Sequence, residues 1–197
     1  AAVTGSGLPY ERPENMGDRV AELLIAGKPV ARAAGEMEFG ARALGNRSIL
    51  ADPGNQDVVR VINQMVKKRD FWMPFAPAST DELLNGAFTV PNSLKPHGSP
   101  YMMFAFDTNE AIKESVVCGI HQADNTARVE TLSKDRYPDF HEIVTEFHKQ
   151  TGIPASLNTS FNLHGFPIVA TTQQAIEVLL DSKIDVLVVG DYSFKKK

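Results

Sequence analysis

Four clusters along the chain carry residue types that suit an anionic ligand. The first covers residues 36–48, where glycines and an asparagine let backbone N–H groups converge, and where Arg42 and Arg47 add guanidinium groups. A phosphate or carboxylate requires such bidentate donors on a chain that can approach closely. The alternative is a structural loop in which the two arginines pair with Glu36 and Glu38.

The second cluster is basic. Lys67, Lys68 and Arg69 come shortly before a segment of prolines and aromatic residues at 72–77. If this stretch is extended, Lys67 and Arg69 project to one side, because successive side chains of an extended chain alternate. Two cations on one side suit a polyphosphate. The alternative is a basic last turn of the preceding helix, which the helix dipole favours.

The third cluster contains an arginine inside a predicted strand. Arg128 lies between Ala127 and Val129, after a turn signalled by Asp124-Asn125. If the two apolar neighbours face a core, alternation turns Arg128 the other way. Arg128 therefore faces either solvent or a cleft.

The fourth cluster is a short apolar strand that runs into small polar side chains at 156–162, among them Ser160 and Asn162. Loops at the carboxyl ends of strands are where open α/β sheets bind ligands. Hydroxyl and amide groups here could hold ribose, phosphate or a Mg²⁺-bound water. The alternative is a turn whose polar side chains satisfy one another.

Alternating strands and helices must position these clusters, and that alternation predicts an α/β open sheet. We expect helices around 20–26, 58–66 and 140–147, the last closed by Gly152, and another behind a capping box of Thr171 and Gln174. Extended segments are expected at 29–34, 48–51, 71–78, 101–106, 126–132, 154–158, 167–170 and 185–189. Residues 35–46 are predicted to form a loop, and residues 84–100 a mobile loop or insertion.

Composition narrows the function. The 197 residues carry 20 Lys and Arg against 24 Asp and Glu, a formal charge of −4, which argues against general nucleic-acid binding. No apolar run reaches the length of a membrane helix. Cys118 is the only cysteine, which fits a reducing compartment. We read His141 and His148, seven residues apart, as surface histidines, and predict no metal ligands.

The clusters, in this order, resemble the C-terminal region of the O-carbamoyltransferase family, which includes antibiotic and nodulation-factor carbamoyltransferases. The likeness covers roughly residues 27–195. The pieces that carry it are EFGARALGNRSILADP at 38–53, VKKR at 66–69 with Trp72 and PFAP at 74–77, NTARV at 125–129, and NTSFN at 158–162.

The resemblance implies a YrdC-like fold, a twisted open mixed sheet with flanking helices. It implies that ATP, with Mg²⁺, and carbamoyl phosphate bind and react to carbamoyl-adenylate. It assigns catalytic roles to Lys67, Arg69 and Arg128. The same resemblance places Arg47, Asn158 and Ser160 in the ligand pocket, and the clusters themselves add Arg42, Ser48 and Asn162 as ligand-binding candidates.

Family members carry a large N-terminal domain of the actin/hexokinase-like class, where the acceptor hydroxyl is carbamoylated. We therefore expect residues 1–13 to be a flexible lead-in or linker remnant and residues 14–197 to be the C-terminal domain, with the N-terminal domain as its partner. A cytoplasmic location is expected, and a homodimer is left open.

Two alternatives stay open. YrdC-like domains also make threonylcarbamoyl-adenylate from threonine and bicarbonate. A domain of this kind could also bind nucleotide or RNA without catalysis.

Overall fold

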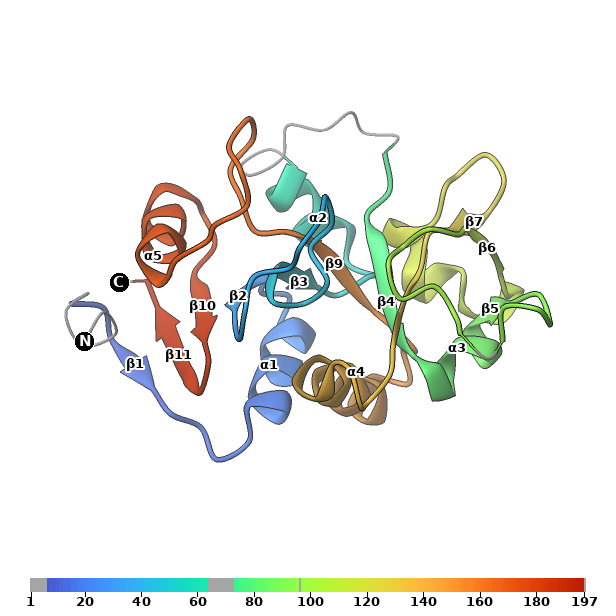
Figure 1. The fold of residues 1–197 in the computed structure, drawn as a ribbon, viewed down its shortest axis with the longest axis horizontal. Helices are drawn as coiled ribbons and strands as arrows, with labels where there is room; N and C mark the ends of the chain where they lie inside the picture. The colour runs from blue at the N-terminus through green and yellow to red at the C-terminus, as the bar shows by residue number, and fades with distance from the viewer. Residues whose placement is uncertain (1–6, 64–72, 96, 197) are drawn as a thin grey trace.

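Helices and strands alternate along the chain in this computed structural model, which describes residues 7–63, 73–95 and 97–196 (Figure 1). Lys67 and Arg69 lie outside the described residues. The strands are β1 (Tyr10–Glu11), β2 (Val30–Ala33), β3 (Arg47–Ala51), β4 (Ala76–Thr80), β5 (Phe88–Thr89), β6 (Phe106–Thr108), β7 (Thr126–Ala127), β8 (Glu130–Leu132), β9 (Ser156–Ser160), β10 (Val186–Val189) and β11 (Tyr192–Lys195). The helices are α1 (Met16–Ile25), α2 (Gln56–Ile62), α3 (Asp81–Ala87), α4 (Pro138–Thr151) and α5 (Thr172–Asp181), with 3₁₀ turns η2 (Glu110–Ile112) and η3 (Glu114–Gly119).

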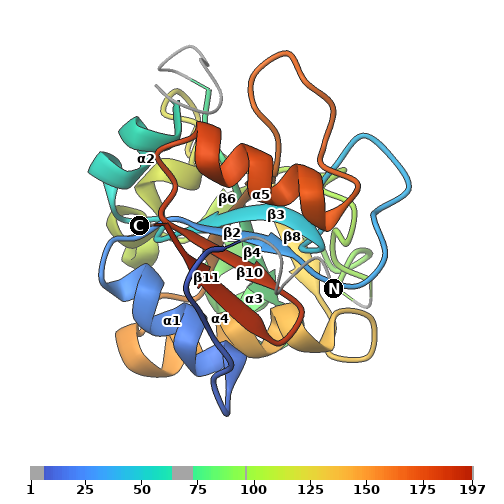
Figure 2. The same ribbon diagram turned by 90° about the vertical axis from the view of Figure 1, so that its left-hand side faces the viewer.

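Eight strands form one mixed sheet in the order β1-β11-β10-β2-β3-β9-β4-β8. Strand β10 runs parallel to β2, and β4 runs parallel to β8, while the remaining neighbours are antiparallel. Helices cover both faces, with α5 on one side and α1 and α4 on the other (Figure 2). The predicted α/β open sheet is confirmed.

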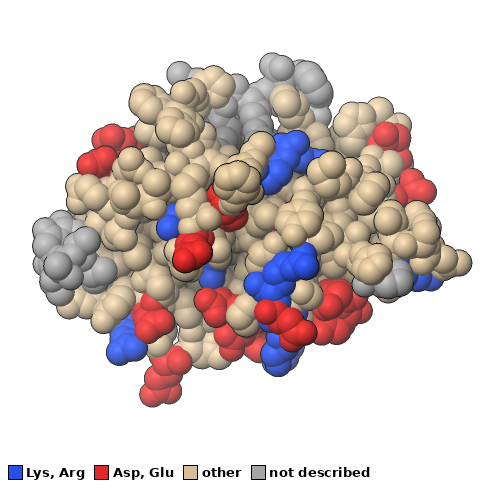
Figure 3. All heavy atoms as spheres, in the orientation of Figure 1, with Lys and Arg blue, Asp and Glu red and all other residues tan. Residues whose placement is uncertain are grey.

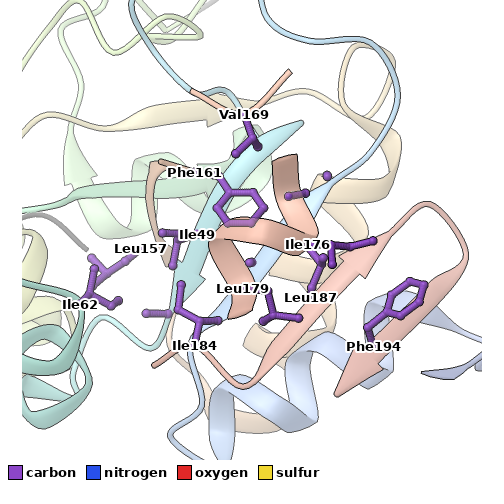
Figure 4. Packing of buried hydrophobic residues seen from close by; sticks show 14 of the residues in the cluster. Ile49, Ile62, Leu157, Phe161, Val169, Ile176, Leu179, Ile184, Leu187 and Phe194 are labelled. Atoms are coloured by element: carbon purple, nitrogen blue, oxygen red, sulfur yellow. The ribbon is translucent and has the colours of Figure 1, made fainter. Parts of the chain in front are cut away.

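The face under α5 is closed by apolar side chains from the central strands. Ile49 of β3 and Leu157 of β9 pack with Ile176 and Leu179 of α5 in one buried cluster (Figure 4). The capping box of Thr171 and Gln174 begins α5 as predicted. This cap fixes where the chain turns from the loop after β9 onto the sheet.

The opposite face is covered by two helices that pack on each other and on the sheet. Leu24 of α1 and Phe140, Ile143 and Phe147 of α4 are buried against Leu50 of β3. Helix α4 ends at Gly152, whose backbone is left-handed with φ of 75°, and this end was predicted from the glycine.

The prediction of a mobile loop or insertion at 84–100 missed regular structure among the residues described there. Helix α3 ends in this segment and strand β5 lies within it, and Leu84, Phe88 and Val90 are buried with Phe106 in a separate small core under the sheet β5-β6-β7. Sparse periodicity hid these elements because each is very short.

Three other predicted strands differ in the structure. Residues 101–106 form turns until β6 begins at Phe106, and residues 167–170 form no strand. The predicted strand 126–132 is divided at Arg128 and Val129, because β7 pairs in the small sheet and β8 in the large one. The chain therefore changes sheets beside a predicted site residue.

Candidate functional site

One edge of the large sheet collects most of the predicted site residues. The strand directions bring the carboxyl ends of β2, β9 and β10 to the same edge as the amino ends of β3, β4 and β8. Ser48, the second residue of β3, lies opposite Ser160 at the end of β9. Arg128 lies two residues ahead of Glu130, the first residue of β8. Segments far apart in sequence thus converge, as the resemblance requires.

Strand register places Ser48, Asn158 and Ser160 on one face of the sheet, the face covered by α1 and α4. Ser48 faces Ser160 across the β3–β9 pair, and Asn158 faces the buried Leu50. Ser48 and Asn158 are buried, while Ser160 is half-buried. The Ser48 hydroxyl accepts a hydrogen bond from the Gly45 N–H at 3.0 Å.

The polar turn after β9 partly satisfies itself. The Ser160 hydroxyl donates to Asn162 Oδ1 at 2.7 Å, and Asn162 Nδ2 donates to the carbonyl oxygens of Leu163 and Phe166. Both side chains are half-buried and therefore still reach solvent. The self-satisfied turn considered from the sequence is observed, and it holds these groups at the edge.

Arg47 lies on the other face of the sheet. It pairs with Ala33, and its guanidinium donates to four carbonyl oxygens, those of Ala34, Gly35, Asn46 and Ala170, at 2.9–3.3 Å. Among the described contacts, the Arg47 guanidinium forms no ion pair with Glu36 or Glu38. In this structure Arg47 ties the loop after β2 to the segment before α5, and it does not share a surface with Asn158.

The other predicted cations differ in exposure. Arg42 is exposed on the loop after β2, and Arg128 is half-buried at the start of β8. Lys67 and Arg69 belong to the part of the chain for which no structure is described. The residues that follow, Met73–Phe75, lead into β4 at the same edge.

Arg32 is a buried cation that the sequence analysis missed. It pairs with Ser48 across β2 and β3, in one row with Ser160. Its guanidinium donates to the Gly45 carbonyl and lies 3.4 Å from a carboxylate oxygen of Asp139, and burial lowers its pKa. The signal was its position in an apolar strand, where a charged residue is rarely buried without partners.

Glu130 is a second missed residue, and it is completely buried. Asn158 Nδ2 donates to Glu130 Oε2 at 2.6 Å and to the Ala43 carbonyl oxygen at 3.1 Å. Contact across β4 is possible because the intervening residues, Ala76 and Ala78, are small. The pKa of Glu130 is raised to about 8, mainly by burial and to a smaller extent by the nearby carboxyl of Glu38, against the lowering effect of the Asn158 hydrogen bond. Because side chains alternate along an extended chain, residues 128 and 130 project to the same side, and this spacing could have revealed Glu130 in the sequence.

Glu38 shapes the loop that covers this region. Its Oε1 accepts the backbone N–H groups of Leu44, Asn46 and Arg47 at 2.7–3.1 Å. One carboxylate thus gathers the N–H groups that the sequence analysis expected to meet a bound anion. In this structure the Glu38 side chain takes the place of such a bound anion.

One group of potential metal ligands exists among the described residues, at the opposite edge of the sheet. His141 Nε2 lies 2.9 Å from Glu82 and 3.8 Å from Asp81, where α3 begins after β4. His141 is buried, so the interpretation of it as a surface histidine was wrong. The group links α3 to α4 and lies away from the residues described above.

Charge is mixed on the face seen in Figure 1. Acidic and basic side chains are interspersed there, without a broad basic area among the atoms shown (Figure 3). This face therefore gives no support to RNA binding, which needs an extended basic footprint. No helix in the described ranges has the length and apolar composition needed to span a membrane.

The fold and the polar sheet edge define an α/β domain of the YrdC-like class. Two solved structures share the fold: phosphate- and nucleotide-bound full-length HypF, with a TM-score of 0.62 and 18% identity over 91% of this chain and 25% of HypF, and YciO of E. coli, with a TM-score of 0.62 and 13% identity over 88% of this chain and 76% of YciO.

The chain belongs to the family described as Carbamoyltransferase C-terminus, which it matches over residues 21–196. It is 38% identical to nodulation protein NolNO of Sinorhizobium fredii over 98% of this chain. It is 37% identical to NolO of Bradyrhizobium diazoefficiens over 96% of this chain. The chain spans 28% and 34% of the length of these two relatives. The resemblance noted in the sequence is confirmed.

Proposed function

We propose that this chain forms carbamoyl-adenylate from ATP and carbamoyl phosphate. Water first hydrolyses carbamoyl phosphate, breaking the bond between its carbonyl carbon or phosphorus and the bridging oxygen, which gives carbamate and phosphate. A carbamate oxygen then attacks the α-phosphorus of ATP while the bond to pyrophosphate breaks, so that carbamoyl-adenylate, pyrophosphate and phosphate are the products. The observation that carries the proposal is the sheet edge where Ser48, Asn158 and Ser160 meet in a chain of the carbamoyltransferase family.

The residues of this chain would act mainly by positioning and by neutralising charge. Ser160 and Asn162 offer hydroxyl and amide groups that still reach solvent. Arg42 and Arg128 offer guanidinium groups on the loop after β2 and at the start of β8. Lys67 and Arg69 are assigned by the resemblance to the leaving pyrophosphate. Such preorganised cations stabilise a developing charge without having to reorganise.

Mg²⁺ is proposed to accompany the phosphates of ATP. No group of three or more His, Cys, Asp or Glu ligands lies at this edge within the described ranges, because the one such group is at the opposite edge. We therefore assign no side chain as a metal ligand. When bound, the ion would neutralise phosphate charge.

The relatives suggest a division of labour. Because this chain covers about a third or less of NolNO and NolO, transfer of the carbamoyl group to an acceptor hydroxyl is proposed to require a further domain. HypF has been solved with phosphate and nucleotide bound, and that property of HypF guides the choice of ligands for testing.

The test is a pyrophosphate-release assay with ATP, Mg²⁺ and carbamoyl phosphate, followed by mass spectrometry for carbamoyl-adenylate. We expect release by the wild type and a loss of roughly 100-fold in Lys67→Ala and in Arg69→Ala, as for removal of one charge-assisted contact in such a site. Lys149→Ala is the matched control, because Lys149 is exposed near the end of α4, away from this edge.

Two results would contradict the proposal. One is full activity in the Lys67→Ala, Arg69→Ala double variant. The other is pyrophosphate release that requires threonine and bicarbonate in place of carbamoyl phosphate, which would assign the chain to threonylcarbamoyl-adenylate synthesis. Binding of ATP with no turnover on either donor would indicate a binding module.

A further inference from the structure

Four buried side-chain oxygens without partners come from the loop of residues 35–46 and from strands β8 and β9. They are Glu130 Oε1, Asn158 Oδ1, Ser156 Oγ and Glu38 Oε2, none of which has a hydrogen-bond partner among the described residues. Glu130 and Ser156 are level with each other across β4, and Asn158 donates to Glu130. Folded proteins satisfy nearly all buried polar atoms, so such a concentration indicates a missing occupant.

The hydrogen bonds of Asn158 fix what it can offer. Both of its N–H groups are used, one by Glu130 Oε2 and one by the Ala43 carbonyl oxygen, and both of these partners are acceptors. The amide therefore cannot be turned around without losing both bonds. Its free atom is Oδ1, an acceptor, which selects an N–H or O–H group and disfavours a phosphate oxygen.

Glu130 offers the complementary group. It is completely buried and has no cationic partner in the described contacts, so its neutral carboxylic acid form is favoured, and that form carries an O–H donor. Donor and acceptor then belong to two side chains that are joined by the Asn158–Glu130 hydrogen bond, and together they can complement the two groups of a planar O=C–NH₂ unit.

We propose that Asn158 and Glu130 bind the carbamoyl group of carbamoyl phosphate, with Asn158 Oδ1 accepting an N–H of its amino group and the Glu130 acid donating to its carbonyl oxygen. The assignment rests on the proposed function. It directs the phosphate away from this pair, toward Ser160 and Asn162 at the sheet edge. The loop of residues 35–46 covers the pair and would shield a carbamoyl group from water, so it has to move when the ligand enters.

Other groups near Glu130 bear on its protonation. Glu38 on the covering loop raises the pKa of Glu130. The pKa of Tyr137, ahead of α4, is raised first by burial and then by the Glu130 carboxyl group. Arg128 lies two residues before it. Helix α3 packs on β8 and carries Asp81 and Glu82, which pair with His141 instead.

Three phosphate compounds can be compared to measure the two proposed hydrogen bonds one at a time. Carbamoyl phosphate has both the amino and carbonyl groups, acetyl phosphate has only the carbonyl, and ethyl phosphate has neither. Calorimetric titration of the chain at pH 7 should show each step weakening binding by on the order of tenfold, the value of one buried hydrogen bond. Asn158→Leu should abolish the first step, and Glu130→Met the second.

Glu130→Gln keeps the shape and offers an N–H donor that does not titrate. It should retain the second step at both pH 7 and pH 9. In the wild type, the affinity difference between acetyl phosphate and ethyl phosphate should shrink by about tenfold at pH 9, because binding of acetyl phosphate would then require protonation of the acid. This comparison of Glu130→Gln with the wild type tests the donor role of Glu130 even if Glu130→Met does not fold. Loss of the step in Glu130→Gln at pH 7 would overturn the acid's role and indicate a cation held by the carboxylate.

The two proposals fail in different ways. Binding of none of the three phosphates by the wild type would refute the proposed function, and this assignment with it. Binding of all three with equal affinity would refute the assignment alone, and would mean that the acid and the amide are closed on each other or on water.

Discussion

Replacement of the buried Glu130 by glutamine should change how the stability of the protein depends on pH. Glu130 is removed from water in the folded state, and its pKa rises to about 8 from an ordinary value of 4.5. The folded protein therefore keeps a proton that the unfolded chain loses between those values. Stability from this group is fully present below pH 4.5 and is lost as the pH rises toward 8.

The size of the effect follows from the two pKa values. One bound proton changes the free energy of unfolding by up to about 1.4 kcal/mol per pH unit, and the whole shift corresponds to roughly 5 kcal/mol. In Glu130→Gln this pH-dependent contribution to the free energy of unfolding is absent. The difference in unfolding free energy between the variant and the wild type should therefore grow in favour of the variant from pH 5 to pH 8, by a few kcal/mol.

The assay is denaturant unfolding, followed by circular dichroism, at one-unit steps from pH 5 to pH 9. Subtracting the wild-type value from that of the variant cancels the titrating groups that do not interact with Glu130. Glu114→Gln is the control, because Glu114 is exposed and its replacement should give a flat difference. If the Glu130→Gln difference is also flat between pH 5 and 8, Glu130 is not protonated in the folded protein and the reasoning from burial is wrong.

Four further changes test the packing of the domain, each by denaturant unfolding. Gly45→Ala should lower the free energy of unfolding by about 2–3 kcal/mol, because φ is 101° and an added Cβ would collide with Phe140. At Gly86 an added Cβ would meet nothing within 4 Å, so Gly86→Ala should raise the free energy of unfolding by up to about 1 kcal/mol. Arg47→Lys should cost about 2 kcal/mol because one ammonium cannot reach four carbonyls; unchanged stability with weakened ATP binding would instead give Arg47 a ligand role. Thr171→Ala should cost about 1 kcal/mol through loss of the α5 cap, and no change would contradict the capping box.

The sequence alone determined the class of fold and the family to which the chain belongs. Capping residues and glycines such as Thr171 and Gly152 act on neighbouring backbone, so the ends of α4 and α5 could be read locally. Apolar strands were recognised for the same reason. The motif at 38–53 was long enough to indicate the family, which the comparison confirmed.

Only the tertiary structure decided which side chains meet. Strand register sends Arg47 to one face and Ser48 to the other, and no local pattern specifies which neighbour lies opposite. Small residues on β4 let Asn158 reach Glu130, a contact between strands that are not adjacent. Burial, which depends on all the elements packed around a group, turned Glu130 from an ordinary acid into one that holds its proton near neutral pH.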